Sequence, residues 1–347
     1  MRLHNRVNKE LLKEKILADK RSRTTLSFYQ YAHIGNPQVF RDHFFLLLNE
    51  LEVFGRIYVS KEGINAQISA LDENWTEFVA AMNTISFLKD IRLNKAIEDD
   101  GKSFFKLTIK LREKIVADGL SDDTFDVTDK GTHVNAEEFN ALANDPETTI
   151  VDMRNHYESE VGHFKGAVTP DVETFKESLP IIEEMLGEKR DKKILMYCTG
   201  GIRCEKASAY FRHKGFENVY QLEGGIIEYT RQANEQDIEN KFIGKNFVFD
   251  DRLGERISND VIAKCHQCGT EDDTHTNCAN DACHILFIQC TNCNTEYEGC
   301  CSIKCKDFNK LPEEEKIELR KTVEFNGTKF GKGRYKANRK DEPLVID

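Results

Sequence analysis

The chain has 347 residues, of which 39% are hydrophobic and 31% charged, and its formal net charge is −11. This length exceeds one ordinary hydrophobic core, so we expect two or three domains. No segment has the roughly 18 to 20 consecutive apolar residues of a membrane helix, and the polar N-terminus lacks the apolar core of a secretory signal. We therefore expect a cytoplasmic protein with no membrane partner. The sequence does not indicate an oligomeric state.

Residues 1–23 form a basic extension, because residues 2–23 hold eight Lys or Arg against three acids. After it, residues 24–116 alternate strand and helix patterns. We expect strands at 25–31, 55–60, 64–68 and 104–111 and helices at 39–51 and 75–82. The order βαββαβ predicts a ferredoxin-like (acylphosphatase-like) α+β sandwich. Modules of this architecture host many functions.

The acidic, turn-rich residues 117–132 are predicted to link this domain to a second one at 133–240. Asn135 and Glu138 have the spacing of a capping box for a short helix. Further on, short apolar strands are expected at 149–152, 194–197 and 219–222, with helices at 205–213 and from 224 onward. Short buried strands alternating with helices predict an α/β domain with a parallel sheet covered on both faces.

Cys198 directly follows the strand expected at 194–197. Open α/β sheets place their ligands at the carboxyl ends of such strands. The backbone N–H groups of the next residues can form an anion-binding nest, and the following helix points its positive N-terminus at the same place. These groups should lower the pKa of the Cys198 thiol from about 8.5. The alternative is a buried structural cysteine. The expected cradle consists of Thr199, Gly200, Gly201, Ile202 and Arg203.

Cys204, at the start of this helix, is a candidate to resolve a persulfide or sulfenate on Cys198 as a disulfide. The alternative is a residue packed inward.

Residues 133–235 resemble a single rhodanese domain. The matching segments are Val-Asp-Met-Arg at 151–154, Gly-His-Phe-Lys-Gly-Ala at 162–167, the six-residue loop at 198–203 and Leu-Glu-Gly-Gly-Ile at 222–226. The resemblance implies that Cys198 accepts a sulfane sulfur as a persulfide held by the loop amides. It also implies that Asp152, Arg154 and His163 frame the loop.

Nine of the eleven cysteines lie in 265–305, within a Cys-rich segment at 241–310. Paired CxxC motifs about 21 residues apart have the spacing of a structural zinc site. We expect one site from Cys265, Cys268, Cys290 and Cys293, and less strongly a second from Cys278, Cys283, Cys300 and Cys305. An iron–sulfur cluster, free thiols and substitution by His266, His275 or His284 remain alternatives.

Residues 311–347 form a basic C-terminal tail, in which 325–340 hold six Lys or Arg and no acid. Phe325, Phe330 and Tyr335 alternate there with cations and glycines, which suits stacking on unpaired bases and contacts with phosphates. A solvated tail explains the same residues equally well.

The order of the three domains, together with Ser-Lys-Glu-Gly-Ile-Asn-Ala at 60–66 and Cys-Thr-Gly-Gly-Ile-Arg-Cys-Glu-Lys at 198–206, resembles the bacterial rhodanese-family tRNA uridine hydroxylases. The resemblance covers roughly residues 24–310. It implies an oxidoreductase that uses molecular oxygen to hydroxylate carbon 5 of the wobble uridine, position 34 in the tRNA anticodon. Cys198 is then the essential catalytic residue.

The sequence carries no signature of a flavin, haem or nicotinamide cofactor. His156-Tyr157-Glu158, with His163 nearby, has the form of an iron-binding facial triad, although an exposed polar turn is the simpler interpretation. A cysteine route is conceivable, in which the thiolate adds to C6 of uracil and makes C5 electron-rich. Two other functions remain open: a rhodanese-type sulfurtransferase and a non-catalytic RNA-binding module.

Overall fold

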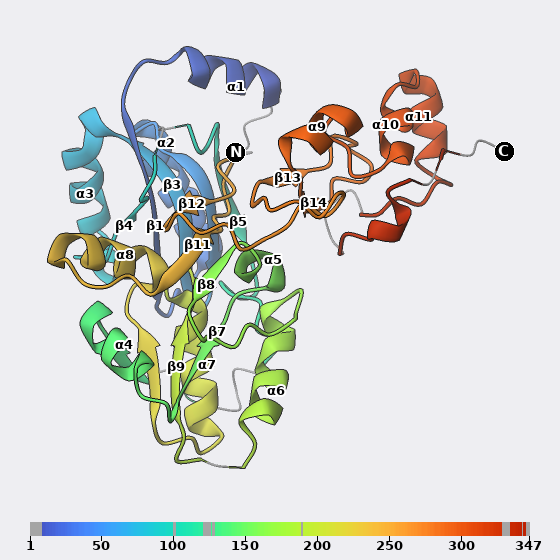
Figure 1. The fold of residues 1–347 in the computed structure, drawn as a ribbon. Helices are drawn as coiled ribbons and strands as arrows, with labels where there is room; N and C mark the ends of the chain where they lie inside the picture. Colours follow the sequence, from blue (N-terminus) through green and yellow to red (C-terminus); the bar gives the residue numbers. More distant parts are fainter. Residues whose placement is uncertain are drawn as a thin grey trace.

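A computed structural model describes residues 9–99, 102–120, 126, 129–188, 190–327, 334–341 and 343–344 (Figure 1). A short helix, α1 (Lys9–Ala18), precedes the N-terminal α+β domain. The central α/β domain lies below that domain in the view, and a Cys-rich domain projects to one side. None of the helices in the described part of the chain is long and apolar enough to cross a membrane.

The N-terminal domain is an acylphosphatase-like sandwich, as the sequence predicts. Two helices pack on one face of a five-stranded sheet with the order β4-β1-β3-β2-β5. Its elements are β1 (Arg23–Tyr31), α2 (Pro37–Glu50), β2 (Phe54–Ser60), β3 (Gly63–Leu71), α3 (Trp75–Asn83), β4 (Asn94–Lys95) and β5 (Leu107–Leu111), with 3-10 turns at Asp72–Asn74 and Ser86–Leu88.

The sheet contains one strand more than the sequence predicts. In the βαββαβ order, the strand after α3 lies beside β1, and the two-residue β4 takes that place. The strand expected at 104–111 is β5, which pairs in parallel with β2 at the opposite edge. A two-residue strand carries too little alternation to be recognised, so the sequence pattern predicts only the four longer strands.

The two faces of this sheet differ in chemistry. The apolar even-numbered residues of β1 and β3, such as Leu26 and Ile68, are buried against the helices. The opposite face is polar and aromatic, and it faces the central domain. Strand register aligns Asn94, Ser27, Gln67 and Arg56 in one row across four strands.

The central domain holds a four-stranded parallel sheet of order β6-β10-β9-β7, which confirms the predicted α/β architecture. The predicted capping box of Asn135 and Glu138 is present at the start of α4. The elements are β6 (Thr132–Val134), α4 (Ala136–Ala143), β7 (Thr148–Asp152), α5 (His156–Ser159), β8 (Gly162–Phe164), α6 (Phe175–Leu186), β9 (Lys193–Tyr197), α7 (Ile202–His213), β10 (Val219–Leu222) and α8 (Gly225–Gln236).

The Cys-rich domain is joined to the central domain by β11, which pairs with β8. Short elements then surround the cysteines: β11 (Phe242–Asn246), β12 (Glu255–Arg256), β13 (His275–Asn277), β14 (Leu286–Ile288), α9 (Thr291–Tyr297), α10 (Ile303–Asn309) and α11 (Glu313–Leu319). A 3-10 turn at Ala337–Arg339 follows.

The described part of the basic tail folds back onto the protein. Phe325 is buried against Phe308, and the Tyr335 ring stacks on Phe287 with ring centroids 5.4 Å apart. Arg334 forms an ion pair with Asp171 at 2.6 Å. Both rings therefore pack within the fold, and the described part of the tail is neither a solvated tail nor a row of free aromatic rings. Phe330 lies outside the described residues.

The Cys198 loop and the cavity above it

Cys198 lies one residue beyond the end of β9, at the carboxyl edge of the parallel sheet. The loop turns sharply at Gly201, whose φ of +99° suits a residue without a side chain. This turn lets the Gly201 N–H donate to the Cys198 Sγ at 3.1 Å, and α7 begins at the next residue. The sulfur therefore lies at a helix N-terminus and accepts a backbone hydrogen bond, as the sequence indicates.

Gly225 allows α8 to approach the same loop. In the first turn of α8, the Ile226 N–H donates to the Cys198 carbonyl at 3.0 Å. A Cβ on Gly225 would lie 2.5 Å from that carbonyl oxygen, so a larger residue cannot occupy this position without displacing the loop.

The environment of Cys198 favours the thiolate. Burial raises the thiol pKa, but a hydrogen bond from the Cys204 thiol, the positive charge of Arg203 and backbone amides outweigh it and lower the pKa to about 6. Burial and the negative sulfur beside it raise the pKa of Cys204 well above its usual value. Cys204 is thus a thiol that donates to Cys198, and it is also packed inward in the hydrophobic core.

Arg203 does not act on the sulfur as an isolated charge. Its guanidinium forms two 2.7 Å hydrogen bonds with the buried carboxylate of Glu158. The Thr199 hydroxyl also lies 3.5 Å from Glu158. Glu158 thereby joins α5 to the loop and fixes the guanidinium. The sequence analysis did not assign Glu158 this contact.

A second buried ion pair lies at the ends of β7 and β9. Arg154 binds Asp152 at 2.7 Å and donates to the Gly162 carbonyl at 2.6 Å, and the Tyr197 hydroxyl donates to Asp152 at 2.8 Å. His163 points Nδ1 at the Ser159 carbonyl, 3.0 Å away.

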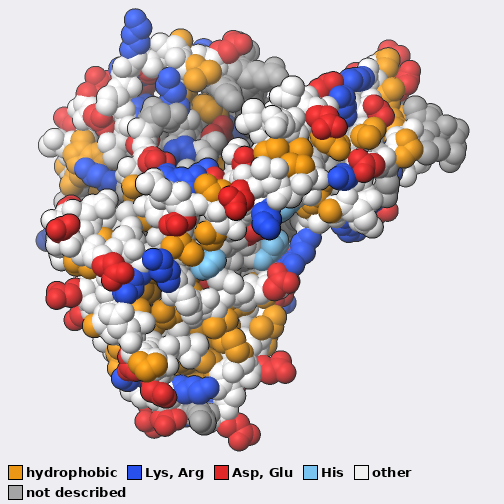
Figure 2. Space-filling model, viewed as in Figure 1, with side chains coloured by type: hydrophobic (Ala, Val, Ile, Leu, Met, Phe, Trp, Pro, Cys, Tyr) orange, Lys and Arg blue, Asp and Glu red, His pale blue; other side chains and the backbone are white. Residues whose placement is uncertain are grey.

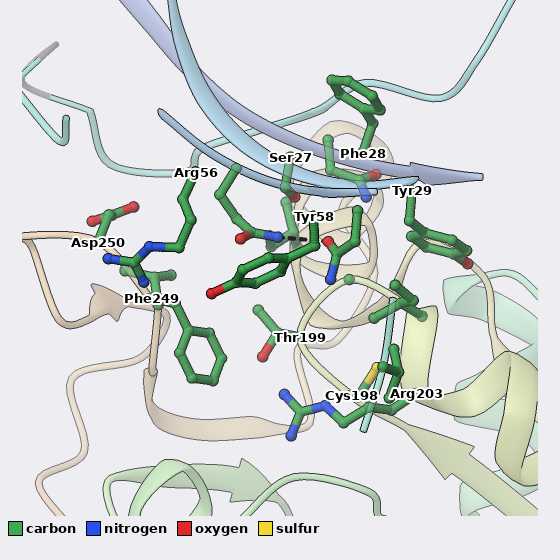
Figure 3. A pocket seen from close by; sticks show the side chains of 18 of the residues that line it. Ser27, Phe28, Tyr29, Arg56, Tyr58, Cys198, Thr199, Arg203, Phe249 and Asp250 are labelled. Atoms are coloured by element: carbon green, nitrogen blue, oxygen red, sulfur yellow. Dashed lines mark hydrogen bonds between the residues drawn. The ribbon is translucent and has the colours of Figure 1, made fainter. Parts of the chain in front are cut away.

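A cavity of about 430 Å³ lies above Cys198, between the loop and the polar face of the N-terminal sheet. Figure 3 shows Cys198, Thr199 and Arg203 below it and Tyr58, Ser27 and Arg56 above, with Phe249 at one side. Cys198 is only 1% exposed, yet it lines this cavity. Other lining residues include Asn65, Gln67, Asn94, Asp250 and Arg252.

The N-terminal domain is docked on the loop by ion pairs with α7. Lys206 is 1% exposed and binds Glu62 and Asp118, each at 2.6 Å. Glu205 accepts from Tyr29 of β1 at 3.2 Å and pairs with Lys130 at 2.7 Å. Two residues near the start of α7, Glu205 and Lys206, thus hold the roof of the cavity in place.

A second cavity, of about 920 Å³, continues from the first toward the Cys-rich domain. The two share Arg56, Asn155, Thr174, Phe249 and Asp250. Figure 2 shows histidine side chains at the junction between the body and the C-terminal arm. The histidines lining this cavity are His156, His266, His275 and His284.

Within the described ranges, two groups of His, Cys, Asp or Glu bring at least three ligand atoms within 4.8 Å of one another, and both consist of four cysteines. The first is the expected set of Cys265, Cys268, Cys290 and Cys293. The second contains Cys278, Cys283, Cys301 and Cys305, so Cys301 takes the place expected for Cys300.

His156, Glu158 and His163 do not form such a group. Glu158 binds Arg203, and both histidines use Nδ1 at backbone carbonyls. The facial-triad interpretation is therefore wrong.

The sequence could not have revealed the roof of the cavity. Alternation along 25–31 and 64–68 predicts strands, but polar residues on one strand face ordinarily indicate contact with water. Only the docking of the domains brings Ser27, Gln67 and Asn94 over the cysteine.

The central fold and loop define a rhodanese-type protein whose active loop is roofed by an acylphosphatase-like domain. Three family profiles match consecutive segments: "UPF0176 acylphosphatase like domain" at 23–115, "Rhodanese-like domain" at 135–232 and "Rhodanase C-terminal" at 243–306. A solved rhodanese-like domain from Anabaena sp. aligns with 32% of this chain and 78% of its own, at 22% identity and a TM-score of 0.26.

Curated relatives match nearly the whole chain. The tRNA uridine(34) hydroxylase of Pectobacterium carotovorum is 56% identical over 329 residues, which are 94% of this chain and 92% of the relative. That of Photorhabdus laumondii is 53% identical over 336 residues, 96% of this chain and 95% of the relative. The chain belongs to the tRNA uridine(34) hydroxylase family.

Proposed function

We propose that this chain is an oxidoreductase that hydroxylates carbon 5 of uridine 34 in the tRNA anticodon, with molecular oxygen as co-substrate and Cys198 as the essential residue. The match to curated relatives across all three domains carries the proposal. The cavity supports it, because a base turned out of its strand can be enclosed above a thiolate. The reaction belongs in the cytoplasm, where tRNA is found.

In this proposal the division of the chain into domains has a chemical meaning. The segment 24–116 roofs the base, the segment 133–240 supplies the thiolate, and the segment 241–310 walls the adjoining cavity. Residues 117–132 connect the first two, and the basic segments 1–23 and 311–347 flank the whole.

The chemistry begins with a nucleophile at C6 of the base. Cys198 Sγ, with a pKa lowered to about 6, is a thiolate at neutral pH. Its addition to C6 would place electron density on C5, and expulsion of the thiolate after oxidation would restore the ring. The net change consumes one O2, two electrons from a reductant and two protons, and it yields the C5 hydroxyl and one water.

A mechanism-based probe tests this step. An anticodon stem-loop with 5-fluorouridine at position 34 should form a covalent adduct with the wild-type protein and none with Cys198→Ser. The absence of an adduct under turnover conditions would remove the C6 route.

The competing function is sulfur transfer through a persulfide on Cys198, which the six-residue loop and the Gly201 N–H would hold. Mass analysis of tRNA nucleosides from cells with and without the gene separates the two. We expect loss of a uridine with one extra oxygen. Loss of a thiolated base would instead indicate a sulfurtransferase, and no change in either would leave a non-catalytic RNA-binding module.

We also propose that the two cysteine groups hold structural zinc. Tetrahedral zinc with Zn–S bonds of about 2.3 Å separates its sulfurs by about 3.8 Å. The Sγ atoms of Cys268 and Cys290 lie 3.6 Å apart, and those of Cys283 and Cys301 lie 3.7 Å apart. Backbone N–H groups also donate to the sulfurs, for example Gly327 N to Cys283 at 3.2 Å. Four thiolates leave no open position, so the metal would stabilise the fold without taking part in the reaction.

Elemental analysis of the purified protein tests this assignment. We expect two zinc ions per chain, and we expect a strong chelator to lower the melting temperature of the Cys-rich domain. Iron, or no metal at all, would contradict it.

A further inference from the structure

The polar groups in the roof of the Cys198 cavity form an ordered hydrogen-bond chain. The Asn65 Nδ2 donates to the Ile115 carbonyl at 3.3 Å, and the Gln67 Nε2 donates to the Asn65 Oδ1 at 2.7 Å. All three residues line the cavity. A backbone carbonyl can only accept, so it directs the Asn65 amide group toward itself. This orientation leaves the Asn65 oxygen for Gln67 and therefore fixes the Gln67 amide as well.

The fixed Gln67 amide places a hydrogen-bond acceptor, its Oε1, at the cavity. One of the two Gln67 Nε2 protons is used in this hydrogen-bond chain, and the Gln67 Oε1 accepts no hydrogen bond among the described residues. Gln67 is half-buried and lines the cavity, so this oxygen can meet a bound ligand. An acceptor in a partly enclosed site favours a ligand that offers an N–H at that point and disfavours one that offers a lone pair.

Asn94 adds a second unsatisfied group in the same row of the sheet. Its Oδ1 is buried without a hydrogen-bond partner in the described part of the chain, and its side chain is 95% buried. Its Nδ2 lies 3.7 Å from the point where a Cβ on Gly200 would stand. Asn94 thus lines the cavity beside Gly200 of the loop, at the end of the strand row opposite Arg56.

The other walls suit a flat ring. Tyr58 and Phe249 approach the cavity from the N-terminal sheet and from the segment after β11 (Figure 3). Phe249 is 40% exposed although it is a large apolar residue, and it lies between the two cavities. Aromatic faces of this kind stack on unpaired bases. The volume falls within the range of about 300 to 1,000 Å³ typical of small-ligand sites.

We propose that Gln67, held in one orientation by Asn65 and the Ile115 carbonyl, accepts the N3–H of a uracil base and thereby selects uridine over cytidine, with Asn94 satisfying a second polar group of the base. Uracil carries a proton at N3, whereas N3 of cytosine is an acceptor. The fixed Gln67 oxygen would therefore bind the first and repel the second. This assignment rests on the proposed function, because it takes a uridine above Cys198 as the ligand.

Binding of anticodon stem-loops without oxygen tests the proposal on the full-length chain. The probes carry uridine, cytidine or 4-thiouridine at position 34. We expect Gln67→Met, which keeps the side-chain length, to lower the ratio of uridine to cytidine affinity by about tenfold or more. The ratio of uridine to 4-thiouridine affinity should stay unchanged, because both keep the N3 proton. Gln38→Met, on the exposed surface of α2, is the matched control.

A second variant separates orientation from contact. Asn65→Leu frees the Gln67 amide to turn its nitrogen toward the base, so cytidine binding should strengthen while uridine binding falls less than in Gln67→Met. Thermal melting of each variant verifies that it is folded.

The outcomes distinguish this inference from the proposed function. Hydroxylation of uridine 34 by the wild type, with an unchanged uridine-to-cytidine ratio in Gln67→Met, overturns the role of Gln67 alone. Selective uridine binding that depends on Gln67, without any hydroxylation, overturns the proposed reaction alone. Absence of stem-loop binding by the wild type overturns both.

Discussion

At the scale of single residues, three buried neighbours determine the state of Cys198. Its sulfur receives hydrogen bonds from the Gly201 amide and the Cys204 thiol, and the Arg203 charge acts in the same direction. Strand end, loop and helix N-terminus were predictable from the sequence, because they follow from local patterns. The partner of Arg203 was not, since Glu158 lies on another element.

The first prediction concerns pH. Modification of Cys198 by iodoacetamide, followed by mass analysis of its peptide, should increase as the pH rises through about 6, because the thiolate is the reactive form. Cys204→Ala removes a hydrogen-bond donor to that thiolate, so its profile should move to higher pH. An unmoved profile would show that Cys204 does not stabilise the charge. Cys198→Ser provides the blank.

The second prediction concerns Glu158. Glu158→Gln leaves the Arg203 charge buried without its partner, and breaking a buried ion pair in this way costs about 3–5 kcal/mol. Thermal melting should show a clearly lower stability. Glu183 forms an ion pair with Lys214 that is more exposed than the Glu158–Arg203 pair. Glu183→Gln should therefore change the free energy of unfolding by about 1 kcal/mol or less. Equal effects of the two variants would contradict this account.

At the scale of elements, strands with a clear apolar pattern were predictable from the sequence, whereas very short strands were not. The strands β7, β9 and β10 lie where their apolar runs indicate. The two-residue β4 left no pattern, and the choice between neighbouring cysteines depends on loop geometry that spacing alone does not determine. In the structure Cys301 joins the second group, whereas the Cys300 sulfur accepts from Asn309 at 3.5 Å.

The third prediction follows from this difference. Cys301→Ser should lower the zinc content by about one ion per chain, whereas Cys300→Ser should leave it at the wild-type value. Both substitutions make the same chemical change at adjacent buried positions, so each controls for the other. Loss of metal in the Cys300 variant would instead support the ligand set expected from the sequence, with Cys300 in place of Cys301.

At the scale of the whole molecule, the cavity exists only because two domains are docked. Lys206 is the centre of that contact, with carboxylates from the N-terminal domain and the segment after it. No sequence pattern assigns a buried lysine to partners 88 and 144 residues away.

The fourth prediction tests the docking. Lys206→Met leaves Asp118 and Glu62 short of a cation, so the urea midpoint reported by Trp75, the one tryptophan of the sequence, should fall. Hydroxylation should fall with it, while Lys214→Met should keep both near wild type. A stable, active Lys206→Met variant would mean that other contacts hold the roof.

The fold-back of residues 334–341 bears on the order in which the protein forms during translation. Synthesis runs from the N-terminus, so these residues leave the ribosome after every partner they contact, including Asp171 and Phe287. The cavity above Cys198 draws its lining from residues up to Glu255, whereas the second cavity also needs Arg334 and Tyr335. A nascent chain can therefore complete the cavity that holds the thiolate before it closes the adjoining one.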